Sequence, residues 1–151
     1  MVPLNSDETN YFEDLYWQRS QPIRQRFEAE LRKVDDSTEV NKSPDYLNLI
    51  KEYAQADIEV RVTAHADTYR RFAKYPTEQD FSAFIDQLKR ETVPRFTLEY
   101  SERYTGLAST LPQDLVQRNL EILSEDIGVT KVGEAASKHL RVLVNEGKIR
   151  Q

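Results

Sequence analysis

Two histidines carry the side chains best suited to acid–base chemistry, and their neighbours in the sequence argue against that role. His65 has Asp67 two residues further on, and residues at that spacing do not share a face of a helix. His139 precedes Leu140 on the inward edge of the last predicted helix. We interpret His65 as a surface or boundary histidine, and His139 as a boundary histidine with a hydrogen-bond partner. Neither is predicted to be a general base.

Metal and phosphate chemistry lack the residues they need. The chain has no cysteine, and two histidines are too few for a zinc site, which needs three or four ligands. Neither histidine has a glutamate three residues before it, so the Glu-x-x-His pattern of di-iron bundles is missing. The four glycines are too scattered to form a phosphate-binding loop. The sequence therefore predicts no catalytic residue, no cofactor and no metal.

Adjacent carboxylates occur at residues 7–8, 35–36 and 125–126. General acid–base catalysis needs carboxylates in a protected cleft that shifts their pKa values. These pairs fall in loops or at helix ends, where acidic side chains cap helices or remain in water. We expect all three pairs to be solvated, and we expect the protein not to be an enzyme.

Eight tyrosines are the most unusual feature of the composition. One interpretation, which we favour, is that they fill the rim of a core short of aliphatic side chains, with hydroxyls reaching water. A second is a protein-binding face, because tyrosine and arginine are enriched at binding hot spots. A third is a small-molecule pocket between long helices. The tyrosines concerned, which alternate with arginines, are Tyr46, Tyr53, Tyr69, Tyr75, Tyr100 and Tyr104.

A cluster of large apolar residues lies near the N-terminus. It could bind a protein partner or a second copy of this chain. It could equally form the first helix of the core, and the sequence does not decide between packing within the chain and packing between chains. The candidate partner-binding residues are Tyr11, Phe12, Leu15, Tyr16 and Trp17.

Helices are the elements expected to position these residues. The chain has only four glycines and six prolines among 151 residues, and straight-chain residues dominate long stretches. We predict an all-α fold, an irregular bundle of five to seven helices around a long central helix at about 44–74. Residues 1–151 form a single domain in this interpretation. The alternative is a long-helix bundle at 1–105 with a small helical unit at 111–151.

Prolines and glycines predict where these helices begin and end. Pro22 predicts a kink or a restart near Ser20, and Pro94 predicts another restart. Thr77 followed by Asp80 is typical of a capped helix start. Helix ends are predicted at the glycines at 106, 128 and 147, and a further cap at the threonine at 130.

The composition also indicates a compartment. The absence of cysteine suits a reducing environment, and the first residues lack the basic and apolar regions of a signal peptide. No apolar run approaches the roughly 18 residues of a membrane span. We therefore expect a cytoplasmic protein with no membrane contact. The net charge of −5 predicts no bulk attraction to nucleic acid.

The C-terminal stretch 123–150 has the pattern of a helix-turn-helix, with a short helix, a glycine turn and a second helix. It contains Ser-x-His-Leu-x-x-Leu at 137–143, followed by a glycine at 147 and an isoleucine at 149. This pattern resembles the recognition region of ArsR-type winged helix-turn-helix repressors. The resemblance implies that Lys131, Lys138 and Arg141 contact DNA.

Three functions follow from these observations. We favour a non-enzymatic interaction or regulatory protein that acts through protein–protein contacts, self-association included. The first alternative is a DNA-binding transcriptional regulator that uses the C-terminal helix-turn-helix. The second is a helical domain that binds a small molecule. An exposed apolar patch, a basic surface and an enclosed cavity would distinguish the three.

Overall fold

The computed structural model describes residues 4–39, 42–127 and 132–150, apart from the side chains of residues 96, 97 and 148–150. These residues form helices and connecting turns and contain no strand, which confirms the predicted all-α fold. The helical segments are α1 (Ser6–Asp36), α2 (Ser43–Arg71), α3 (Glu78–Gln87), the π-helical turn η1 (Leu88–Thr92), α4 (Val93–Leu107), α5 (Gln113–Asp126) and α6 (Val132–Arg150). Because α3, η1 and α4 follow one another without a break, the described chain has five continuous helices.

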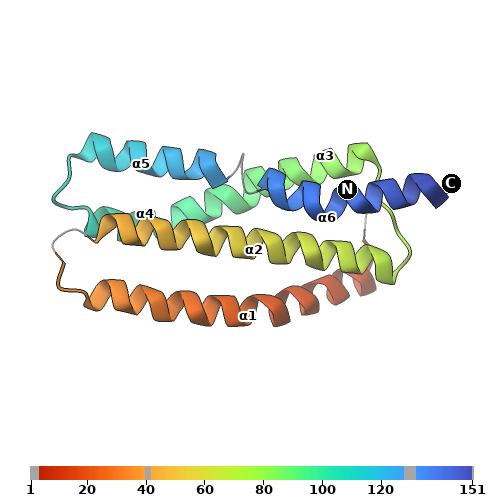
Figure 1. Cartoon of the computed structure of the whole chain (residues 1–151), viewed down its shortest axis with the longest axis horizontal. Coiled ribbons are helices and arrows are strands. Elements are labelled where there is room, and N and C mark those ends of the chain that lie inside the picture. The colour runs from red at the N-terminus through yellow and green to blue at the C-terminus, as the bar shows by residue number, and fades with distance from the viewer. Residues whose placement is uncertain (1–3, 40–41, 128–131, 151) are drawn as a thin grey trace.

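The long helix α2 lies at the centre of the bundle, close to its predicted range (Figure 1). It packs against α1 along one side and against α4 and α6 on the other sides. α5 packs on α4, and α3 packs on α6. Across α2 from α1, α5 lies toward one end of the molecule and α6 toward the other (Figure 1). Every other helix is therefore placed directly or indirectly by α2.

The end of α2 has an unusual backbone. Ala73 has a φ of 53°, in the left-handed region that glycine adopts most easily. The N–H of Lys74 donates a hydrogen bond to the carbonyl of Tyr69 at 2.8 Å, which closes the last turn in the manner of a Schellman motif. An alanine in this conformation costs about 1 kcal/mol relative to glycine. The closure of the last turn therefore retains some backbone strain.

The restart predicted near Ser20 does not occur, because α1 continues through Pro22 to Asp36. A proline inside a helix costs about 3 kcal/mol, through a lost hydrogen bond and a steric clash. Pro22 lies on the exposed side of the helix. Phe12, before the proline, and Phe27, after it, both stack on rings of α2. Packing on either side thus holds the two halves of α1 in one helix.

The helix end predicted at Gly147 is wrong, whereas the end predicted at Gly106 is correct to within one residue. Gly147 lies inside α6, where a Cβ would lie 2.8 Å from the Cβ of Tyr75. This glycine permits close packing instead of ending the helix. Gly106 lies in the last turn of α4, which ends one residue later. The end predicted at residue 128 and the cap predicted at residue 130 lie outside the described residues.

The restart predicted at Pro94 does not interrupt the chain. Pro94 lies in the first turn of α4, and η1 joins it to α3 with a continuous helical backbone. A π-helical turn contains one more residue than the corresponding α-turn. It therefore rotates the residues that follow relative to those before, and this determines which side chains of α3, η1 and α4 face α1 and α2.

One cluster of buried apolar side chains includes residues from all six α-helices. It contains Leu31 of α1, Ile58 of α2 and Phe84 of α3. It continues through Tyr104 of α4 to α5 and α6, across the boundary that the alternative domain division places between residues 105 and 111. The C-terminal helices thus share their core with the rest of the bundle.

Candidate ligand-binding site

His65 is the buried polar side chain for which the fold gives the least explanation. Only 9% of its surface is exposed, so the prediction of a surface or boundary histidine is wrong. The ring of Phe12 stacks on it at a centroid distance of 3.8 Å, and Phe84 meets it edge-on at 4.7 Å. Among the described residues, none offers its buried Nδ1 a hydrogen bond. A buried nitrogen left in this way costs about 1–3 kcal/mol.

Burial keeps this imidazole neutral. Desolvation, with the positive charge of Arg61 on the preceding turn as the smaller cause, lowers the pKa of His65 to about 3. A neutral imidazole offers one N–H donor and one lone pair. Since only Nδ1 is both fully buried and unpaired, the accessible edge of the ring includes Nε2. His65 can therefore exchange a hydrogen bond with a molecule beside it at any ordinary pH.

A cavity of about 340 Å³ lies beside this ring, between α1, α2 and the α3–η1 segment. Its floor is buried and largely apolar and aromatic, and its rim carries exposed polar side chains. A cavity of this size is at the lower end of the range for small-molecule sites. We call it the His65 cavity. It is lined by Leu4, Thr9, Phe12, Glu13, Arg61, His65, Phe84, Gln87, Leu88, Glu91 and Thr92.

The π-helical turn supplies three of these lining residues, Leu88, Glu91 and Thr92. Leu88 and Thr92 are buried against the bundle, whereas Glu91 is exposed at the rim. π-turns are rare and frequently mark functional sites, because they reorient side chains that a regular helix would place elsewhere. The distortion in this long helical segment thus coincides with the cavity.

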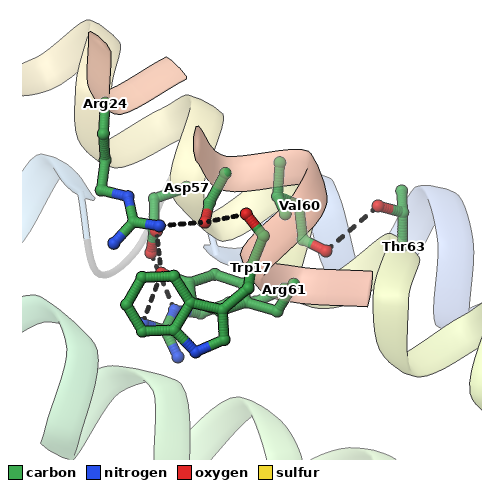
Figure 2. A network of polar contacts seen from close by, with 8 residues as sticks. Trp17, Arg24, Asp57, Val60, Arg61 and Thr63 are labelled. Atoms are coloured by element: carbon green, nitrogen blue, oxygen red, sulfur yellow. Dashed lines mark hydrogen bonds and ion pairs between the residues drawn. The ribbon is translucent and has the colours of Figure 1, made fainter. Parts of the chain in front are cut away.

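A buried ion pair between Asp57 and Arg61 of α2 lies beside His65 along the helix, and the hydroxyl of Tyr16 links it to α1 (Figure 2). Asp57 is only 2% exposed, and its Oδ2 accepts a hydrogen bond from Nε of Arg61 at 2.8 Å. Its Oδ1 accepts a hydrogen bond from the hydroxyl of Tyr16, and Arg61 donates a second one to that hydroxyl at 2.9 Å. Burial, with the hydrogen bond to Asp57 next, raises the pKa of Tyr16. This network fixes Arg61, which forms part of the cavity wall.

The start of α1 is fixed by a second polar contact. Glu8 and Asn5 form a capping box, each side chain bonded to the backbone N–H of the other residue. The carboxylate of Glu8 also accepts a hydrogen bond from Nζ of Lys74 at 2.6 Å, which lowers the pKa of Glu8. The prediction that Glu8 is solvated is therefore wrong, because it is buried between the first helix and the end of α2.

The predicted N-terminal cluster packs mainly within the chain. Tyr11 meets Phe72 edge-on at 5.6 Å, Phe12 stacks on His65, and Tyr16 bonds to the Asp57–Arg61 pair. Leu15 is half-buried. The sequence left open whether this helix packs within the chain, and the structure answers that it packs on α2.

Trp17 is the member of the cluster that remains mostly exposed, at 58%. The guanidinium of Arg24 lies 4.2 Å from the centre of the indole and donates a hydrogen bond to Oγ of Ser20, which donates in turn to the Trp17 carbonyl (Figure 2). Single exposed aromatic residues are common on protein surfaces. Protein–protein contact through this cluster stays a prediction, and Trp17 is the residue that could make it.

Two of the three candidate DNA contacts, Lys138 and Arg141, lie on α6, which packs on α2 and α3. The guanidinium of Arg141 pairs with Glu78 and lies 4.0 Å from the centre of the Phe81 ring. Nζ of Lys138 lies 3.6 Å from a carboxylate oxygen of Glu59, although its side chain is 70% exposed. Lys131 lies outside the described residues. DNA binding stays a prediction, and two of its three candidate residues already face carboxylates.

His139 has the partner that the sequence predicted. Its Nε2 lies 2.9 Å from Oε1 of Glu59, and this hydrogen bond is the main cause of the lowered pKa of Glu59. The bond joins α6 to α2 and is half-buried. His139 therefore contributes to the packing of the C-terminal helix.

Three of the six tyrosines fill the core itself, so the favoured prediction of a rim position is wrong for them. It holds for Tyr53, Tyr75 and Tyr100, which are half-buried and pack against the edge of the core. Tyr46, Tyr69 and Tyr104 are completely buried. Tyr46 and Tyr104 stack at 6.4 Å, and the Tyr46 hydroxyl donates to the carbonyl of Tyr100 at 3.3 Å. The hydroxyl of Tyr69 is buried beside His65 with no hydrogen-bond partner in the described part of the chain. The unpaired polar atoms are thus concentrated near the cavity.

A second hollow of about 530 Å³ lies between α1 and α4, with Tyr53 of α2 in its wall. Its charged residues are balanced, two arginines (24 and 32) against two glutamates (28 and 99). None of the buried unpaired atoms belongs to its lining. The hollow is larger than the His65 cavity, but its polar lining residues carry charges of both signs in equal number.

Signs of other classes of site are missing from the described ranges. Within them, no group of three or more His, Cys, Asp or Glu residues could hold a metal ion. No helix there is long and apolar enough to cross a membrane. No protein-family model, no curated protein and no solved structure matches the chain. The interpretation of the site therefore rests on its own geometry.

Sequence reasoning missed His65 because it examined only the neighbours of that residue in the chain. A signal was nevertheless present, since His65 lies between Ala64 and Ala66 in a helix with a further alanine at 54. Small residues at such positions are typical of a helix that other helices approach closely on several sides. All three alanines are buried.

Proposed function

We propose that this protein is a non-enzymatic regulatory domain that binds a small organic molecule in the His65 cavity. The observation that carries the proposal is the unpaired, buried imidazole beside a cavity lined by three helical segments. A folded protein rarely keeps a buried polar atom without a partner unless another molecule or a function accounts for it. A ligand bonded to the accessible Nε2 would account for a histidine at this buried position.

The shape and lining of the cavity support binding of a molecule with an apolar ring. His65, Phe84 and Leu88 form a buried floor, and the ring of Phe12 forms a wall. Aromatic side chains recognise flat apolar groups through offset stacking and edge contacts. The exposed polar rim then orients the part of the ligand that remains near water.

The arrangement favours binding over chemical turnover. A general base needs a neighbouring group that orients it, and within the described chain neither nitrogen of His65 is bonded to a carboxylate or a hydroxyl. Its pKa of about 3 also lies far from the values that suit proton transfer near pH 7. His65 is therefore assigned a hydrogen-bonding role.

The test is a titration of the ¹⁵N-labelled protein with three probes that share a phenyl ring, namely 2-phenylethylammonium, 2-phenylethanol and phenylacetate. We expect at least one of them to shift the amide signals of residues 65, 84 and 88 at millimolar concentration. Thr9→Phe, which fills the cavity from α1, should abolish those shifts. Thr105→Phe, at an exposed position on α4, is the matched control and should leave them unchanged.

A second blocking variant shows whether a loss of binding in Thr9→Phe reflects a blocked cavity or a folding defect. Gln87→Trp adds bulk at the exposed rim, where no core packing is disturbed. It should block the same shifts while the spectrum of the free protein stays native-like. If none of the three probes shifts these signals, or if both blocking variants bind as well as the unaltered protein, the proposed function is wrong.

A further inference from the structure

We propose that the His65 cavity selects an organic cation, a protonated amine carried on an apolar body of about the size of one ring. This inference rests on the proposed function and deepens it by giving the chemical class of the ligand. It follows from three features of the cavity: the charge left unpaired at its rim, the hydrogen-bonding capacity of His65, and the aromatic rings around it.

The charges that line the cavity do not balance. Among the described residues that line it, Arg61 is the one cation, and the buried carboxylate of Asp57 already neutralises it at 2.8 Å. Glu13 and Glu91 are exposed at the rim, and neither forms an ion pair with a described residue. Glu91 accepts only an amide hydrogen bond, from Gln87 at 3.2 Å. The mouth therefore carries two carboxylates that have no ion-pair partner among the described residues.

His65 complements a cation because it is neutral. A protonated imidazole would repel an ammonium group, but this ring has lost its proton through burial. Its lone pair can accept a hydrogen bond from an N–H donor of the ligand. Because no described residue donates a hydrogen bond to this ring, an ammonium N–H that reaches the accessible Nε2 meets no competing donor.

The aromatic rings provide the third feature. Phe12 and Phe84 line the cavity on either side of His65, at centroid distances of 3.8 and 4.7 Å from its ring. Aromatic faces attract cations within about 6 Å of their centres, most strongly where water is excluded. The same rings would repel a carboxylate. A ligand with an ammonium group and an apolar ring thus meets a favourable partner at the rim, in the wall and at the floor.

The three phenyl probes test this selectivity directly, because they differ mainly in charge. At low salt we expect 2-phenylethylammonium to bind about tenfold more tightly than 2-phenylethanol, with phenylacetate weakest. Glu13→Gln and Glu91→Gln should each weaken binding of the ammonium probe about two- to fivefold, and leave the alcohol unaffected. Glu121→Gln, at an exposed position on α5, should change neither.

The outcomes separate this inference from the proposed function. If the alcohol or the carboxylate binds at the cavity as tightly as the ammonium probe, the cavity binds ligands but does not select cations. The same conclusion follows if the two rim variants bind the ammonium probe as tightly as Glu121→Gln does. If no probe reaches the cavity, the site itself is wrong. A preference for the ammonium probe that is lost in the double variant Glu13→Gln/Glu91→Gln supports the inference.

Discussion

The two ends of the α1–α2 pair are built on different principles. At one end, Phe27 of α1 stacks on Tyr53 of α2 at 4.2 Å, and Tyr100 of α4 meets Phe27 edge-on at 5.4 Å. At the other end, the same two helices enclose a buried ion pair, an unpaired imidazole and a cavity. We call these the aromatic end and the cavity end.

The difference teaches where the molecule holds its structure and where it could act. The aromatic end pairs its buried hydroxyl at Tyr46 and fills its space with rings. The cavity end leaves polar atoms at His65 and Tyr69 unpaired, and sequences that specify a single fold normally avoid such atoms. Violations of local rules in a stable protein are expected at functional sites. The cavity end should therefore contribute less to the free energy of unfolding than its buried area alone would predict.

The largest expected effect comes from breaking the buried ion pair at the cavity end. Asp57→Ala removes the acceptor of both Arg61 and Tyr16 and leaves the guanidinium without its charge partner. Loss of one member of a buried pair typically costs about 3–5 kcal/mol. Urea denaturation should show this loss in the free energy of unfolding.

The control for this comparison lies on the same helix. Glu52→Ala changes an exposed carboxylate of α2 and should cost less than about 0.5 kcal/mol. If Asp57→Ala cost no more than Glu52→Ala, the network at the cavity end would not hold α1 on α2.

The next effect is a pH dependence that originates at His65. The folded protein keeps this histidine neutral down to pH about 3, whereas the unfolded chain takes up a proton near pH 6.5. Between these values the unfolded state binds more protons, so stability falls as the pH falls. We expect a loss of about 2 kcal/mol between pH 7.5 and pH 5 from this residue.

His65→Phe isolates that contribution, because it keeps a flat ring but cannot titrate. Urea unfolding at a series of pH values should show a shallower decline for the variant than for the unaltered protein. Parallel curves would mean that His65 is protonated equally in both states, and the account of a buried neutral ring would then fail.

Removal of a buried tyrosine hydroxyl should have a smaller effect on the free energy of unfolding, with opposite signs at the two ends. Tyr69→Phe removes a hydroxyl that is buried without a partner and should stabilise the protein by about 1 kcal/mol. Tyr46→Phe removes a hydroxyl that donates to the Tyr100 carbonyl and should destabilise it by a similar amount. Thermal unfolding of the two variants measures both. Effects of the same sign would remove the distinction between the two ends.

The smallest expected effect concerns the last turn of α2, beside the cavity end. Ala73→Gly relieves the left-handed conformation at a φ of 53° and should stabilise the protein by about 0.5–1 kcal/mol. Ala83→Gly, at an exposed position inside α3, should destabilise it by about as much. Equal effects of the two substitutions on the midpoint of thermal unfolding would contradict the strain at Ala73.

Local features were predictable where the responsible partner lies nearby in the chain. Thr77 and Asp80 form the capping box that their spacing indicated, with the N–H of Asp80 bonded to the Thr77 hydroxyl at 3.1 Å. The all-α class followed equally from composition and apolar spacing. Pro22 shows the limit, because its effect on α1 depends on rings of α2 that no local pattern identifies.

The candidate site was not predictable in this way. His65 is buried by Phe12 and Phe84, which belong to other helices and lie far from it in the chain. Gly147 was interpreted as a helix end because nothing in its neighbourhood reveals the close approach of Tyr75. The cavity depends on the packing of three segments, and only their relative positions create it.

The π-helical turn has a consequence for how such a protein could change over generations. Because the turn holds one extra residue, deleting a single residue from Leu88–Thr92 would convert it to a regular α-helical turn. The tighter turn would offset the missing residue, so α4 would keep the orientation that packs Val93 and Tyr104 in the core. Only the side chains within the turn, which form one wall of the His65 cavity, would be rearranged. A single codon therefore separates a chain with this wall of the binding site from one that keeps the bundle without it.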